Sequence, residues 1–128
     1  MKHARVAFSG AVHDATPHGD GLRLADGRVL AQDAVVWLPP FEPGTVIALG
    51  LNYADHAKEL SPPVNDEPLA FLKGAGSLIG HRGFTWRPAD AAFMHYECEL
   101  AVVIGCRAKH VKRADAMAYV AGYTVAND

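Results

Sequence analysis

Two glutamates separated by one residue are the strongest chemical signal in the sequence. Glu97 and Glu99 lie in the stretch YECELAVVIG, residues 96–105, which is typical of a β-strand. On a strand their carboxylates leave the same face, about 6.6 Å apart. Like charges held that close favour a cation between them, and a divalent metal ion is the candidate. The alternative is a strand that begins in solvent, because half-exposed antiparallel strands alternate in the same way.

A histidine and a glutamate three residues apart form a second candidate pair. His56 and Glu59 lie in the segment from Asn52 to Leu60, which we expect to form a short helix that stops before Pro62-Pro63. On such a helix the two side chains share a face, and a carboxylate beside an imidazole is the arrangement of a general base. A solvated charge pair on a surface helix is the alternative.

Further polar residues follow expected strands. Lys73 ends an expected strand that begins at Leu69, and a glycine-rich loop containing Ser77 follows it. A lysine beside flexible glycines could hold an anionic substrate group, although a plain loop with a solvated lysine fits the composition equally well. Asp128 is a third acid at the end of an apolar strand. Three hard oxygen donors would select Mg²⁺, Mn²⁺ or Ca²⁺ over zinc.

The elements that must position these residues fall into two parts. Residues 1–44 predict a small β-rich subdomain with a tight hairpin at Asp26-Gly27, and prolines mark a boundary near residue 44. Residues 45–128 predict strands over 45–50, 69–73, 96–105 and 123–126 and a short helix over 113–120. The apolar even positions of 96–104 should be buried. A strand that runs into the terminus predicts a domain cut short, and hence a fragment of a longer protein.

The bulk composition limits the classes of function. Half of the 128 residues are hydrophobic and the net charge is -2, which predicts a globular protein without a basic surface for nucleic acid. No apolar run is long enough to span a membrane and no signal-peptide core is visible, so a cytoplasmic location is the default. Cys98 and Cys106 have no C-x-x-C spacing. We expect reduced, structural thiols on the buried face of the strand.

Four short motifs in order resemble the fumarylacetoacetate hydrolase family. They are LGLNYADH at residues 49–56, PLAFLK at 68–73, the strand with Glu97 and Glu99, and YVAGYTVAND at 119–128. The resemblance covers residues 45–128. Within the family, residues 94–99 and 114–117 are most similar to the isomerase/decarboxylase branch of homoprotocatechuate breakdown. That branch acts on 2-hydroxyhepta-2,4-diene-1,7-dioate and its carboxylated precursor.

This resemblance implies an α+β, mainly β fold, a mixed β-sandwich roll truncated here at its C-terminus. It implies a divalent metal, Mg²⁺ first, at the positions of Glu97, Glu99 and Asp128, and a homo-oligomer in the full-length protein. It further implies a catalytic pair and a set of residues that line the substrate pocket. The catalytic pair is His56 and Glu59, and the pocket residues are Asn52, Tyr53, Lys73 and Ser77.

Three functions are compatible with these residues. The first is a metal-dependent isomerase/decarboxylase of a dicarboxylic 2-oxo acid, in which the metal stabilises an enolate. In the family that the chain resembles, many hydrolytic members carry an arginine at the position of Leu51. The leucine here therefore favours the isomerase/decarboxylase. The second is a hydrolase of acylpyruvates such as fumarylpyruvate, with His56 activating water. The third is a non-catalytic fragment of either enzyme.

Overall fold

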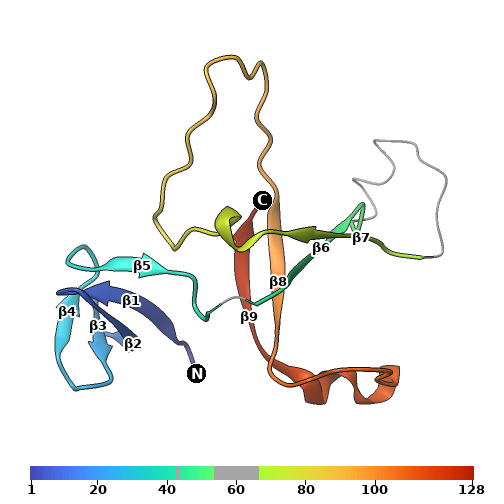
Figure 1. Cartoon of the computed structure of the whole chain (residues 1–128). Helices are drawn as coiled ribbons and strands as arrows, with labels where there is room; N and C mark the ends of the chain where they lie inside the picture. Colours follow the sequence, from blue (N-terminus) through green and yellow to red (C-terminus); the bar gives the residue numbers. More distant parts are fainter. Residues whose placement is uncertain (43, 54–66) are drawn as a thin grey trace. The chain divides into compact units, whose positions relative to one another are not determined.

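Strands dominate the chain, as the sequence predicts. The computed structural model describes residues 1–42, 44–53 and 67–128, and internal contacts divide the chain into two units, Met1–Thr85 and Trp86–Asp128. The helical segments within the described ranges are short 3₁₀ helices (Figure 1). The predicted boundary near residue 44 lies inside the first unit and stays a prediction.

The first unit begins with a five-stranded antiparallel sheet. Its spatial order is β4-β3-β2-β1-β5. The predicted hairpin is confirmed, since Leu22 pairs with Leu30 across a turn in which Gly27 has a φ of 90°. Glycine reaches that region without steric cost, which permits the tight reversal. The strands are β1 (Ala4–Phe8), β2 (Ala11–His18), β3 (Gly21–Leu24), β4 (Val29–Ala31) and β5 (Val36–Leu38).

The buried core among the described residues lies on one face of this sheet. It consists of Val6, Ala15, Leu22 and Leu24, and Trp37 packs against it. Leu22 and Leu24 are two positions apart on β3, so the alternation of the strand sends both to the same face. The core is therefore small and local to residues 1–38.

A two-stranded ribbon follows in the same unit. Strand β6 (Val46–Gly50) pairs antiparallel with β7 (Leu69–Lys73), with Val46 opposite Lys73. The 3₁₀ helix η1 (Ala75–Ser77) comes next. Strand β7 has the predicted bounds. The helix predicted from Asn52 to Leu60 lies almost wholly outside the described residues, which omit 54–66.

Residues 80–82 contact the end of the five-stranded sheet within the first unit. A Cβ added at Gly80 would lie 1.9 Å from the backbone oxygen of Trp37, so this close approach requires glycine. The His81 ring meets the Trp37 indole edge to face, with centroids 4.9 Å apart. Arg82 donates to the Gln32 side-chain oxygen at 3.3 Å. These contacts join the loop after η1 to the sheet.

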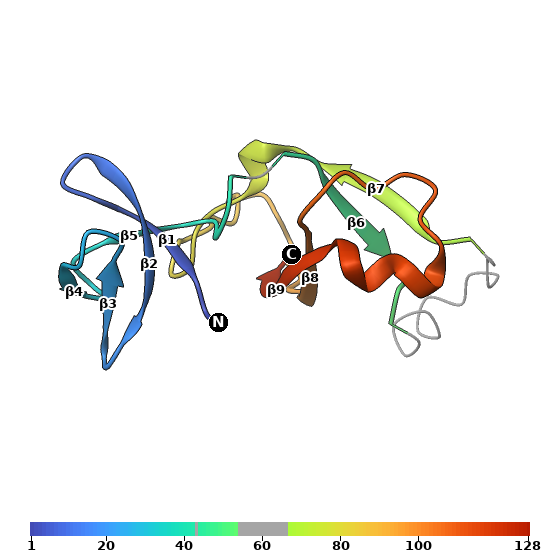
Figure 2. The ribbon, with the colours of Figure 1, turned by 90° about the horizontal axis from the view of Figure 1, so that it is seen from below.

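The second unit is built on one antiparallel pair. Strand β8 (Cys98–Ile104) pairs with β9 (Val120–Asn127), and the 3₁₀ helix η2 (Arg113–Tyr119) leads directly into β9 (Figure 2). A short helix was predicted here, and the structure has its 3₁₀ form. Strand β9 begins three residues before the predicted start because Val120 pairs with Ile104 across an irregularity at Val103/Ile104.

The prediction that the even positions of β8 are buried is wrong. Leu100, Val102 and Ile104 are 62%, 48% and 56% exposed. Alternation did group these side chains on one face, but no described segment of the second unit forms a layer over it. Cys98 and Cys106 are free, as predicted, yet both are exposed, so the prediction of buried thiols is also wrong. The odd or even position of a residue along a strand tells which face its side chain is on, but not whether another segment covers that face.

Candidate metal centre

The three acids predicted to bind metal share one face at one end of the β8–β9 pair. Glu99 lies opposite Ala126, and the same register sets Glu97 opposite Asp128. The backbone N–H of Asp128 donates to the Glu97 carbonyl at 2.8 Å. Residues directly opposite in a hydrogen-bonded antiparallel pair have Cα atoms about 5.5 Å apart, and their side chains share a face. Glu97 is therefore about 5.5 Å from Asp128 and about 6.6 Å from Glu99 at the backbone, and Glu99 and Asp128 are diagonal neighbours about 7–8 Å apart.

The surroundings of these acids differ from those of the exposed apolar face. Glu97 and Glu99 are half-buried, whereas Asp128 is exposed. The next positions on the acid face carry small side chains, Ala101 paired with Thr124. Among the residues that the structure describes, no three histidine, cysteine, aspartate or glutamate side chains converge as a ligand group. Carboxylate oxygens are donors of the kind that a hard divalent cation prefers, but the three described side chains do not converge, so the metal and its ligand set stay predictions.

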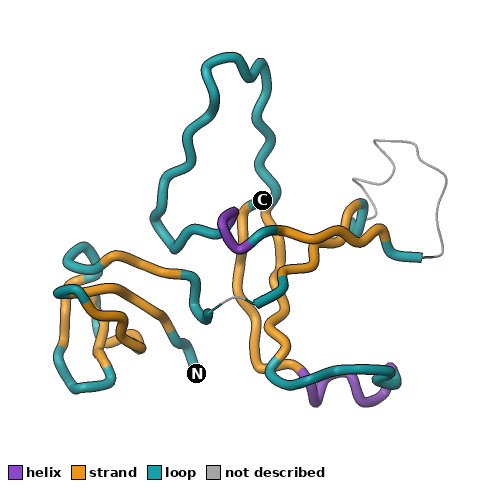
Figure 3. Tube along the Cα trace, in the orientation of Figure 1, coloured by secondary structure: helices purple, strands orange, loops and turns teal. Residues whose placement is uncertain are grey.

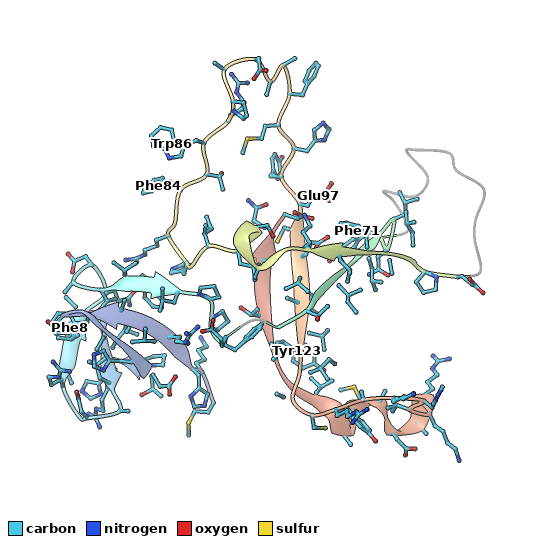
Figure 4. The ribbon with its side chains drawn as sticks, viewed as in Figure 1. Phe8, Phe71, Phe84, Trp86, Glu97 and Tyr123 are labelled. Atoms are coloured by element: carbon cyan, nitrogen blue, oxygen red, sulfur yellow. The ribbon has the colours of Figure 1, made fainter. Side chains whose placement is uncertain are left out.

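Glu97 marks the point where a long loop becomes a strand. Residues 78–97 contain no helix or strand (Figure 3). Glu97 lies at the end of this loop, immediately before β8 (Figure 4). Upstream of it, Phe84 and Trp86 are 87% and 91% exposed. The backbone of Glu97 is hydrogen-bonded to Asn127 and Asp128.

One residue that holds Glu97 was missed by the sequence reasoning. The Glu97 N–H donates to the side-chain oxygen of Asn127 at 3.0 Å. Asn127 is the last residue of β9 and lies opposite Cys98. The signal in the sequence is an asparagine directly before the third acid, in the motif YVAGYTVAND at residues 119–128.

The predicted substrate-binding residues belong to the first unit. Lys73 ends β7 half-buried, and its ammonium lies 5.7 Å from the centre of the Phe71 ring. Such a cation–π contact orients the lysine. The Ser77 hydroxyl donates to the Gly74 carbonyl at 2.7 Å, which closes the turn of η1. These contacts leave both roles as predictions.

The remaining predicted site residues surround the part of the chain that is not described. Asn52 and Tyr53 follow β6 and are exposed. Leu51, just before them, has a φ of 55°, a left-handed conformation that non-glycine residues rarely adopt. His56 and Glu59 lie outside the described residues, so their pairing stays a prediction.

The comparisons with known proteins identify the family. The fold is that of a strand-rich α+β chain with acids in register at a strand end. Residues 45–128 match the family described as fumarylacetoacetate (FAA) hydrolase C-terminal. The chain belongs to this family, and the resemblance noted in its motifs is confirmed.

Three relatives illustrate the match. The homoprotocatechuate catabolism bifunctional isomerase/decarboxylase of Escherichia coli is 56% identical over 89 residues, which cover 70% of this chain and 21% of that protein. The mitochondrial oxaloacetate tautomerase FAHD2A of Homo sapiens is 46% identical over 101 residues, covering 78% and 32%. A solved 5-carboxymethyl-2-hydroxymuconate delta-isomerase from Mycobacterium smegmatis has a TM-score of 0.80 at 36% identity, covering 100% of this chain and 54% of that one.

These matches bear on the fold and on the extent of the chain. The structural likeness over the whole chain confirms the predicted fold class, a mainly β fold of the fumarylacetoacetate hydrolase type. The chain spans about a fifth to a half of the length of these relatives. In the part of the chain with described coordinates, no helix has the length and hydrophobicity needed to cross a membrane.

Proposed function

We propose that the protein is a metal-dependent isomerase/decarboxylase of a dicarboxylic 2-oxo or 2-hydroxydienoic acid in aromatic catabolism. The observation that carries the proposal is the register that aligns Glu97, Glu99 and Asp128 on one face. The bifunctional isomerase/decarboxylase at 56% identity supports the choice of reaction. The Mycobacterium smegmatis isomerase supports it independently through its structure.

The acids would hold the cation through carboxylate oxygens. Mg²⁺ is the first choice, with Mn²⁺ and Ca²⁺ as alternatives, because all three prefer oxygen ligands. When bound, the ion would supply Lewis-acid stabilisation of the negative charge that develops on the 2-oxo group. The backbone of Glu99 lies in the ladder of β8, and the backbone of Glu97, just before that strand, is bonded to Asn127 and Asp128.

Other residues of the chain would move the proton and bind the substrate. In the proposal His56 transfers the proton between carbon atoms, and Glu59 orients its imidazole. Lys73 would pair with a substrate carboxylate through its ammonium group. Asn52, Tyr53 and Ser77 would complete the polar lining of the substrate pocket.

The test is conversion of the dienedioate. The chain is incubated with 2-hydroxyhepta-2,4-diene-1,7-dioate and Mg²⁺, and the ultraviolet absorption of the diene is followed. We expect a spectral change that chelation of the metal abolishes and that His56→Ala reduces at least a hundredfold. An unchanged diene spectrum would refute the isomerase proposal, and pyruvate release from fumarylpyruvate would indicate a hydrolase instead.

A second candidate function has its own observation. The human relative at 46% identity is named an oxaloacetate tautomerase. Keto–enol exchange of a 2-oxo dicarboxylic acid likewise adds a proton to, or removes one from, the carbon next to the 2-oxo group, and its other proton is carried by the enol oxygen. Loss of the enol absorption of oxaloacetate, faster with the chain than without it, would favour this candidate if the dienedioate does not react.

A further inference from the structure

We propose that Asn127 is a positioning residue for the candidate metal centre, and that its side-chain amide holds Glu97 opposite Asp128. The inference rests on the proposed function, because the position of Glu97 matters to a cation only if the three acids bind one. Asn127 would act through the backbone of Glu97 and would not touch the metal.

The backbone of Glu97 is held by two consecutive residues of the partner strand. Its N–H donates to the Asn127 side-chain oxygen at 3.0 Å, and its carbonyl accepts from the Asp128 N–H at 2.8 Å. In a regular antiparallel pair both bonds run between the backbones of opposite residues. At Glu97 a side chain accepts the N–H, so the identity of Asn127 and not only the strand pairing fixes this peptide.

The position of Asn127 separates its role from that of a ligand. It pairs with Cys98, one position away from the pair Glu97 and Asp128. Alternation therefore assigns Asn127 and the acids to opposite faces of the two strands. The side chain of Asn127 is exposed, so removing it leaves no cavity in a core. An effect of Asn127 on metal binding would come from the placement of Glu97.

The location of Glu97 makes a hydrogen bond to its backbone important, because it lies where a loop meets a strand. It follows a stretch without regular structure, residues 78–97, and β8 begins only at Cys98. An unanchored residue at a strand end frays, and a frayed ligand must be ordered again when the cation binds. Hydrogen-bond partners that orient metal ligands are typically worth 10- to 100-fold in metal affinity. We expect an effect of that size here.

The experiment compares the full chain with Asn127→Ala and Asn127→Asp. Alanine removes the acceptor, and aspartate keeps an oxygen at the same reach. Exchange of the Glu97 amide hydrogen is followed by NMR, and free Mn²⁺ is measured by electron paramagnetic resonance. We expect Asn127→Ala to accelerate Glu97 exchange and to weaken Mn²⁺ binding 10- to 100-fold. Exchange at Ala101 and the unfolding temperature should stay unchanged, and Asn127→Asp should retain both protection and affinity.

Three other results are possible, and each would contradict a different part of the proposal. Unchanged Glu97 exchange in Asn127→Ala would overturn the hydrogen bond as the means of positioning. Faster exchange with Mn²⁺ affinity within twofold of the wild type would overturn the link to metal binding. Wild-type chain that binds no Mn²⁺ would overturn the metal-dependent function itself, and the positioning role with it. That last result can be told apart from the other two because it is measured on the wild-type chain and not on a variant.

Discussion

Replacing Glu99 by glutamine tests the candidate metal centre most directly. Glutamine keeps the length and shape of the side chain and removes one of the three negative charges. Glu99 lies opposite Ala126 within β8, where its backbone belongs to the regular ladder. The substitution should therefore leave the fold intact and change only the affinity for a cation.

The size of the effect follows from the charges. A dication about 3 Å from the charge centre of a carboxylate is attracted by about 2.8 kcal/mol even at the dielectric constant of water. Glu99 is half-buried, so the effective dielectric is lower and this value is a minimum. The remaining amide oxygen can still coordinate the ion and offsets part of the loss. We expect Glu99→Gln to weaken Mn²⁺ binding about a hundredfold.

The assay is calorimetric titration of Mn²⁺ into the full chain. Asp115→Asn is the matched control, since it removes the same charge from η2, which precedes the opposite end of β9. Its Mn²⁺ affinity should stay within twofold of the wild type. The reasoning is refuted if Glu99→Gln binds within threefold of the wild type, or if the control loses as much affinity as the test variant.

Three further predictions concern the framework of the first unit. Val6 is fully buried, so Val6→Ala should destabilise the sheet by about 2 kcal/mol in denaturant unfolding followed by Trp37 fluorescence, and a loss under 0.5 kcal/mol would contradict the core assignment. Gly80→Ala forces a Cβ against the Trp37 backbone and should alter the near-ultraviolet dichroism of that indole, which an unchanged spectrum would disprove. The hydrogen bond from Arg28 lowers the pKa of Asp26, so the stabilising contribution of Asp26 is present above the ordinary carboxyl pKa and is lost as pH falls through the lowered one. Arg28→Ala should raise the Asp26 pKa toward its ordinary value in an NMR titration, and an unchanged midpoint would count against the bond.

Local signals in the sequence were sufficient for most of the individual elements. The Asp-Gly turn and the alternation around it predicted the hairpin that pairs Leu22 with Leu30, and apolar content predicted strand 69–73. These features depend on residues close together in sequence. They require only local backbone preferences, which the residue types carry.

Tertiary features were predicted less well, because they depend on partners far away in the chain. The early start of β9 follows from the pairing of Val120 with Ile104, which no local pattern encodes. The exposed face of Leu100 and Val102 was expected to be buried, since a sequence shows which side chains share a face and not whether a second layer covers them. Which side chains share a face and whether that face is buried must therefore be predicted separately.

The candidate metal centre also has one part that local sequence predicts and one part that depends on strand pairing. That Glu97 and Glu99 share a face follows from strand alternation alone. That Asp128 joins them requires the register of β9, because a slip of one residue would turn Asp128 to the opposite face. The register is fixed at one end where Gly105 donates to the Tyr119 carbonyl at 2.8 Å, and at the other where Asn127 and Asp128 bond to Glu97. The third carboxylate is therefore placed by hydrogen bonds at both ends of the strand pair, and a substitution that weakens either end should act on metal affinity before it acts on the fold.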